Sequence, residues 1–172
     1  MVRALFDAGL LSEGPFELIE GEILHKMGKR RPDVHVTMRA LGWLIGVFGL
    51  DYVQKEDPIA LDEHNEPEPD CVVLTHPAEY YLAVGTPPAS DVRLVIEVAD
   101  STLAEDRRIK SRLYAMAGIP EYWIVDITGR QLLVHRVPQN DVYTSVVAVT
   151  STESIACLAA PDAPVRVSSL LP

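Results

Sequence analysis

Residues 94–127 read LVIEVADSTLAEDRRIKSRLYAMAGIPEYWIVDI, and this stretch decides the fold that the sequence predicts. Residues 94–99 are nearly all apolar, as expected of a strand that is buried on both faces. Residues 102–117 predict a helix, because glycine and proline follow its expected end. Residues 122–126 predict another buried strand. A strand, a helix and a strand in this order favour an α/β fold.

The segments on either side predict more strands and one long helix. The expected elements are a hairpin at 16–24, a helix at 33–48, extended segments at 52–61 and 70–74, and strands at 132–136 and 143–149. Residues 75–91 and the tail from residue 151 are expected to be mainly loops. Together these elements predict one domain over residues 1–172, with helices packed on a central mixed sheet.

The composition is that of a globular protein with an acidic balance. Apolar residues make up 48% of the chain, charged residues 23%, and the net charge is −10. This charge argues against a general DNA-binding surface, because nucleic-acid binders usually present a basic field. The N-terminus has no signal-peptide pattern, and the most apolar stretch is too short to span a membrane. The two cysteines form no disulfide or zinc pattern, which favours the cytoplasm.

Two carboxylates stand at the strands of the predicted sheet. Glu97 is the one charge in its apolar strand, and an isolated buried carboxylate needs a partner, a proton or a metal. Asp70 follows two Glu-Pro pairs and leads into the next apolar strand, so the prolines fix where it enters the sheet. An arginine partner for Glu97 and an ordinary acidic loop around Asp70 are the alternatives.

Lys110 on the following helix is the third candidate. Projected at about 100° per residue, it lies at the margin of the apolar face formed by Ile109, Leu113, Met116 and Ala117. The alternative is a simple ion pair with Asp106 four residues earlier, which stabilises a helix by a few tenths of a kcal/mol. Two carboxylates with a nearby lysine suit a hard divalent cation and metal-assisted hydrolysis.

Four stretches resemble the bacterial putative restriction endonuclease family of the PD-(D/E)XK nuclease superfamily. They are FELIEGEI, EPEPDCVVL, residues 94–127 and LLVHR, and they extend over most of the chain. The resemblance implies a restriction-endonuclease-like core, with Asp70 and Glu97 as the two acids of the motif. The usual lysine two residues after the second acid is replaced by Ala99, and Lys110 matches a lysine that has moved to the helix.

The same resemblance implies further roles around the metal. The carbonyl of Val98 is expected as an additional ligand. Among the hairpin acids Glu17, Glu20 and Glu22, we choose Glu22 as an auxiliary metal ligand, although surface hairpins often carry glutamates. His35 matches a histidine common in the family and is an auxiliary candidate, although a lone histidine at a helix start is usually only a polar residue.

These residues predict a metal-dependent endonuclease that hydrolyses DNA phosphodiester bonds with Mg²⁺, for which Mn²⁺ can substitute. The metal would lower the pKa of a water, and Lys110 would position that water or stabilise charge on the phosphate. The alternative is a catalytically inactive nuclease fold that serves as a binding or assembly module, which the acidic charge favours.

The helix at 33–48 is apolar on two opposite sides. Val34, Met38, Leu41, Ile45 and Phe48 form one stripe, and Val36, Ala40, Trp43 and Val47 form the other. One side should cover the sheet. We expect the second stripe, around Trp43, to lie in a homodimer interface or under another element of the chain.

Overall fold

The computed structural model describes Gly9 and residues 16–26, 28–100 and 103–172 of the chain. Its centre is a six-stranded mixed sheet in the order β3-β4-β5-β6-β7-β8. Strands β5 and β6 run parallel, and every other neighbouring pair is antiparallel. The strands are β3 (Val53–Gln54), β4 (Cys71–Leu74), β5 (Val92–Ala99), β6 (Glu121–Asp126), β7 (Gln131–Gln139) and β8 (Val142–Thr150). The predicted mixed sheet is therefore present.

Helical segments connect and cover these strands. A parallel pair needs a long crossover, and α4 (Leu103–Glu105), the π turn η3 (Asp106–Lys110) and α5 (Ser111–Met116) supply it between β5 and β6. The longest helix is α2 (Arg31–Phe48). The remaining elements are β1 (Phe16–Ile19), β2 (Glu22–His25), η1 (Leu50–Tyr52), α3 (Ala78–Val84), η2 (Ala89–Asp91), β9 (Ser154–Ile155), β10 (Val165–Arg166) and α6 (Val167–Leu170).

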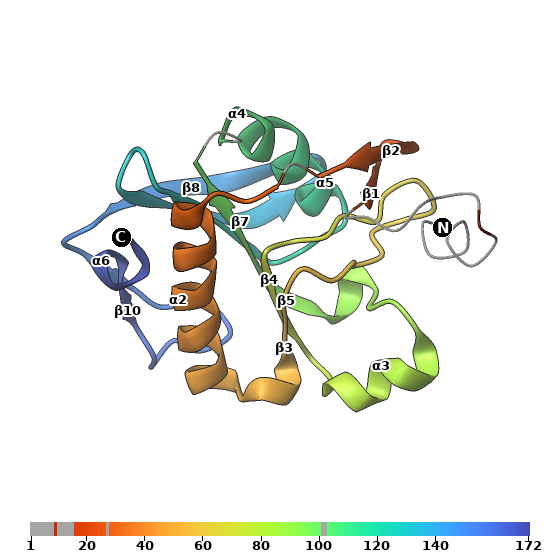
Figure 1. The fold of residues 1–172 in the computed structure, drawn as a ribbon, viewed down its shortest axis with the longest axis horizontal. Helices are drawn as coiled ribbons and strands as arrows, with labels where there is room; N and C mark the ends of the chain where they lie inside the picture. Colours follow the sequence, from red (N-terminus) through yellow and green to blue (C-terminus); the bar gives the residue numbers. More distant parts are fainter. Residues whose placement is uncertain (1–8, 10–15, 27, 101–102) are drawn as a thin grey trace.

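The sheet carries a different apolar cluster on each face. Cys71, Ile96 and Trp123 point to the face covered by α2 and α6. Alternate residues such as Val95 and Tyr122 point to the face covered by the α4–α5 crossover. Figure 1 shows α2 beside α6, with α4 and α5 at the upper part of the view near the β1–β2 hairpin. The crossover face is the one on which the charged residues of the site lie.

The stripe around Trp43 lies against the chain's own sheet. Val36 and Ala40 are completely buried in the core, and the Trp43 ring stacks on Trp123 with centroids 5.4 Å apart. Of the stripe Val36, Ala40, Trp43 and Val47, for which a homodimer interface or cover by the chain itself was expected, the first three residues therefore lie under the chain's own sheet. The opposite stripe contributes the exposed residues, with Val34 and Met38 about half accessible.

Two other parts differ from the sequence-based expectation. The extended segment at 52–61 contains only the two-residue strand β3. The tail forms β9, β10 and α6, which place Cys157, Val165 and Leu170 in the core beside α2. The tail looked like a loop because its elements are too short to show a periodic pattern.

The β1–β2 hairpin is where the sequence predicts it, and its turn is tight. Glu20 and Gly21 both have positive φ angles, 51° and 82°, as a type I′ turn requires. Backbone hydrogen bonds join Leu18 to Glu66 in both directions, at 2.8 and 3.2 Å. This pairing fixes the hairpin beside the segment that leads into Asp70, so Glu17 is brought to the crossover face.

Within the described residues, no helix is long and apolar enough to cross a membrane. Cys71 and Cys157 are both free and buried, in agreement with the absence of a disulfide pattern in the sequence. Burial raises the pKa of the Cys71 thiol to about 12. The cysteines therefore act as core residues in this structure.

Candidate functional site

Asp70 and Glu97 lie opposite each other on neighbouring strands. Strand β4 pairs with β5 so that Cys71 is opposite Ile96, and one step further along this register Asp70 is opposite Glu97. Strand alternation puts both side chains on the crossover face, because Cys71 and Ile96 point to the other one. Both carboxylates are buried. Two acids that are far apart in sequence thus meet at one point of the sheet.

The sheet backbone and one lysine hold Asp70. The Val98 N–H donates to Asp70 Oδ2 at 2.7 Å, and the Lys29 ammonium donates to Oδ1. The N–H and C=O of one residue point to the same side of a strand, so the Val98 carbonyl also faces Asp70. This carbonyl can therefore add an oxygen beside the two carboxylates.

A lysine and a tyrosine hold Glu97. The Lys110 ammonium donates to Glu97 Oε1 at 2.9 Å, and the Tyr114 hydroxyl donates to the same oxygen at 3.0 Å. Burial raises the pKa of Glu97 to about 7, an effect that Lys110 opposes and that the nearby carboxylates of Asp70 and Asp106 reinforce. The charge of Glu97 therefore depends on the cations around it.

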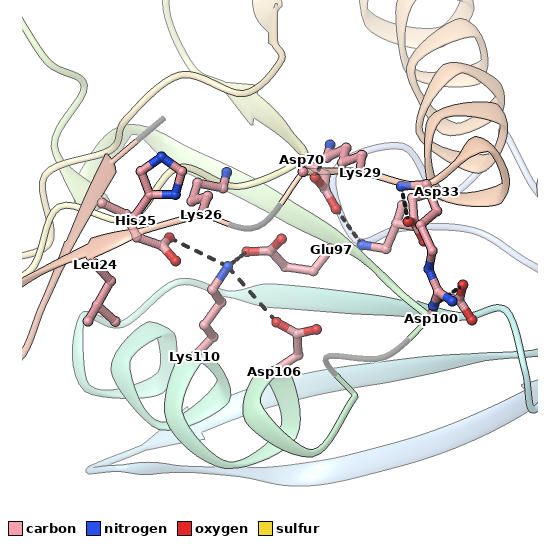
Figure 2. Close-up of a pocket in the computed structure, with 14 residues that line it drawn as sticks. Leu24, His25, Lys26, Lys29, Asp33, Asp70, Glu97, Asp100, Asp106 and Lys110 are labelled. Atoms are coloured by element: carbon pink, nitrogen blue, oxygen red, sulfur yellow. Dashed lines mark hydrogen bonds and ion pairs between the residues drawn. The ribbon is translucent and has the colours of Figure 1, made fainter. Parts of the chain in front are cut away.

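Lys110 lies at the centre of three carboxylates. Its Nζ is 2.9 Å from Glu97 Oε1, 3.6 Å from Glu17 Oε2 and 3.9 Å from Asp106 Oδ1, and Figure 2 shows all three contacts meeting at the ammonium. Burial alone would lower the pKa of Lys110, but the carboxylate of Glu97, helped by the other two, raises it above its ordinary value. Lys110 is therefore an ammonium at neutral pH.

These residues line a cavity of about 400 Å³. Six of its fourteen lining residues are acidic and four are lysine or arginine, so acids exceed bases by two. Three of the four bases come from the loop between β2 and α2, and each contacts an acid: Lys26 with Glu68, Lys29 with Asp70 and Glu56, and Arg30 with Asp100. The loop is thus held across the cavity by ion pairs.

A family model described as Uma2, putative restriction endonuclease, matches residues 9–166. The chain belongs to the Uma2 family. Its fold is similar to that of the crystal structure of a putative nuclease belonging to DUF820 from Anabaena variabilis, with a TM-score of 0.71 and 16% identity over 96% of both chains. No curated protein sequence matches the chain. The predicted family and the predicted restriction-endonuclease-like mixed fold are confirmed.

In this Uma2 chain, the structure brings together most of the residues chosen from the sequence. Asp70, Glu97, Val98 and Lys110 all line the cavity. Asp70 directly precedes β4, Glu97 and Val98 are on β5, and Lys110 is in the π turn, in the order that the motif predicts. The partner of Glu97 is Lys110 rather than an arginine, and the Lys110–Asp106 pair is present together with two further carboxylates around the same ammonium.

Two other predicted residues lie outside the cavity. Glu22 is exposed at the turn end of β2, and Glu17 of β1 instead reaches the Lys110 ammonium. The structure therefore places Glu17 rather than Glu22 at the cavity: both acids are on one face of the hairpin, but Glu17 is two residue pairs farther from the hairpin turn. His35 is exposed on α2 and does not line the cavity.

Sequence reasoning missed Asp106 and Lys29 as residues of the cavity. Asp106 was interpreted only as the helical partner of Lys110, yet it is buried and lines the cavity. Lys29 belonged to a basic loop with no periodic pattern. The run of basic residues at 26–31 in an acidic chain was the available signal for Lys29.

The donor set of the Uma2 site fits a hard divalent cation. Among the described residues, no three His, Cys, Asp or Glu side chains form a ready-made metal cluster. Mg²⁺ is usually held by only one or two carboxylates together with waters and substrate phosphates, so a complete protein cage is not required. Asp70, Glu97 and the Val98 carbonyl would hold it, because they offer oxygen donors from two adjacent strands.

Proposed function

We propose that this chain is a Mg²⁺-dependent endonuclease that hydrolyses DNA phosphodiester bonds. The observation that carries the proposal is the meeting of two buried carboxylates from adjacent strands with a buried ammonium from the following helix. The Uma2 family, described as putative restriction endonucleases, supports nucleic acid as the substrate. When bound, Mg²⁺ would polarise the scissile phosphate and lower the pKa of a water.

The surrounding residues give Lys110 an electrostatic role. A general base must release its proton near neutral pH, and the raised pKa of Lys110 makes it a poor base. Its fixed ammonium instead supplies positive charge and hydrogen-bond donors beside the two acids. Glu17 and Asp106 also lie within 4 Å of this ammonium and help to hold it in place, and the Tyr114 hydroxyl orients the Glu97 carboxylate.

A plasmid-nicking assay tests this function. The wild type should nick supercoiled DNA with Mg²⁺ or Mn²⁺ and lose activity with a chelator. Asp70→Asn and Glu97→Gln should abolish nicking, whereas Glu22→Gln is a matched control that changes an exposed acid outside the cavity. Equal cleavage by all four proteins would mean a contaminant and would refute the assignment.

The alternative function is an inactive nuclease fold used for binding or assembly. The acidic cavity is the observation that favours it, because a polyanion must approach a site in which acids outnumber bases. Retention of all three charged residues in one cavity favours the enzyme. A Mn²⁺ titration separates the two, since the inactive module would show no metal binding that depends on Asp70.

We also propose that the chain acts as a homodimer, through β8 rather than α2. Strand β8 is at the edge of the sheet, and Val146 and Val147 are each about half exposed there. Residues 142–150 carry no charge, so this edge would not repel a second copy of an acidic chain, and antiparallel pairing would satisfy backbone groups that pair with no other described strand. Val146→Lys should convert a dimer to a monomer in sedimentation velocity; an unchanged dimer would exclude this surface.

A further inference from the structure

Each of the two central acids is bonded to a lysine that also contacts a second acid. The Lys110 ammonium donates a hydrogen bond to Glu97, and its Nζ lies 3.6 Å from Glu17 Oε2. Lys29 bonds Asp70 and also pairs with Glu56. Two ammonium groups therefore balance the charge of the acid pair, and each has another carboxylate within reach.

We propose that Lys29 is a resident counter-ion which a divalent metal displaces from Asp70, and that Glu56 keeps Lys29 paired after the exchange. The inference rests on the proposed metal site at Asp70 and Glu97. Asp70 is buried, and a buried carboxylate is less costly when a cation is paired with it. Lys29 supplies that cation in the metal-free protein.

The hydrogen bonds of Asp70 indicate which contact is exchanged. Its Oδ2 accepts the Val98 N–H of the central sheet, a bond that is fixed by the strand backbone. Its Oδ1 is bonded to Lys29, whose side chain comes from the loop between β2 and α2. A metal that takes Oδ1 must therefore move the lysine rather than the sheet.

Lys29 is better placed to move than Lys110. The Lys110 side chain is 10% exposed and has three carboxylates around it, whereas the Lys29 side chain is 24% exposed. Gly28, the residue before it, is exposed, and a Cβ added there would meet no atom within 4 Å. The Glu56 side chain is one-third exposed, whereas that of Asp70 is 7% exposed, so the ammonium can leave Asp70 and remain in an ion pair with a more accessible carboxylate.

Calorimetric titration of Mn²⁺ into the full chain without DNA tests the exchange. Lys29→Met should bind Mn²⁺ about tenfold more tightly than the wild type, because the metal no longer competes with an ammonium. Lys26→Met is the matched control: it removes the same charge from the same cavity, but its contacts are with Glu68 rather than Asp70. Lys26→Met should change the affinity for Mn²⁺ by about twofold or less.

A double-mutant cycle tests the part played by Glu56. Glu56→Gln should weaken Mn²⁺ binding in the wild-type background, since among the described residues Asp70 is then the carboxylate left to Lys29. The same change should have little effect in the Lys29→Met background, because position 29 then carries no ammonium with which Glu56 could pair. An equal effect in both backgrounds would refute the role of Glu56 and leave only a general loss of negative charge.

The outcomes separate this inference from the proposed function. Equal or weaker Mn²⁺ binding by Lys29→Met, with the wild type binding, would overturn the exchange but leave the metal site intact. Absence of Mn²⁺ binding by both proteins would overturn the metal site itself and the exchange with it. Lys29→Arg should weaken Mn²⁺ binding, because a guanidinium can donate two N–H hydrogen bonds to the Asp70 carboxylate. This change is opposite to the one expected for Lys29→Met, so it tests the exchange even if Lys29→Met misfolds.

Discussion

Replacing Lys110 by methionine removes the cation shared by Glu17, Glu97 and Asp106 while nearly preserving side-chain volume. Each of these four side chains is 10% exposed or less, so water screens the loss poorly. Breaking a buried ion pair by removing one partner typically costs about 3–5 kcal/mol. We therefore expect Lys110→Met to lower the free energy of unfolding by about 3–5 kcal/mol at about pH 8.

The pH dependence of this loss has a definite sign. Burial raises the pKa of Glu97 to about 7 in the folded protein, above its ordinary value of 4.5, so the contribution of Glu97 to stability falls as pH rises from 4.5 to about 7 and then levels off. Without Lys110 the folded-state pKa of Glu97 is higher still, and the variant continues to lose stability above pH 7. The difference between the two proteins should therefore grow by about 1.4 kcal/mol per pH unit in that range.

Urea unfolding followed by circular dichroism measures the effect at about pH 6.5 and pH 8. Arg112→Met is the matched control, because Arg112 follows Lys110 closely on the same crossover but pairs with Glu20 at the surface. That exposed pair should be worth less than about 1 kcal/mol. A Lys110→Met loss below about 1 kcal/mol at pH 8, or one that does not change with pH, would refute the convergence of three carboxylates on Lys110.

Three further predictions follow from the site and the core. Glu17→Gln should lower metal-dependent nicking by about tenfold, whereas Glu22→Gln should not; equal losses would contradict the placement of Glu17 beside Lys110. Mn²⁺ affinity measured by calorimetry should fall as pH drops below about 7, because burial raises the pKa of Glu97 to about 7 and its protonated form is a poor ligand; a flat profile would be the contrary result. Cys71 should resist iodoacetamide in the folded protein, since burial raises its pKa to about 12, and mass spectrometry showing rapid alkylation would disprove this.

The order of the site residues along the chain could be predicted because each sits at a strand or helix with a strong sequence pattern. Asp70 precedes an apolar strand, Glu97 interrupts one, and Lys110 lies on the helix that follows. The parallel β5–β6 pair then obliges the crossover to pack over one face of the sheet, which brings Lys110 to Glu97.

Distances that depend on three-dimensional docking could not be predicted. The hairpin acids Glu17 and Glu22 have the same sequence character, and only the pairing of Leu18 with Glu66 shows which of them approaches Lys110. Lys29 is in a loop, where no helical or strand periodicity indicates the direction in which a side chain points. The two apolar stripes of α2 also gave no indication of whether the chain itself or a second copy covered Trp43.

The apolar face of the helix predicted at residues 102–117 was predicted only in part, because an α-helical projection does not hold across a π turn. Leu113 is buried as expected, but Met116 is more than half exposed, and Tyr114 points into the sheet instead. The turn at Asp106–Lys110 contains more residues per turn than the 3.6 used in the projection. Sequence alone carries no reliable mark of such a turn.

The π turn also limits how this segment can change in length. Deleting one residue, such as Arg107, would let the crossover become a regular α-helix with little rotation of its two flanks, because a π turn is an α-helical turn that holds one extra residue. The spacing of Asp106 and Lys110 would change from four residues to three, so their contact of 3.9 Å in the cavity would be replaced by a different side-chain register. Insertions and deletions here are thus tied to the charge arrangement of the cavity, whereas the exposed surface loops are free to vary in length.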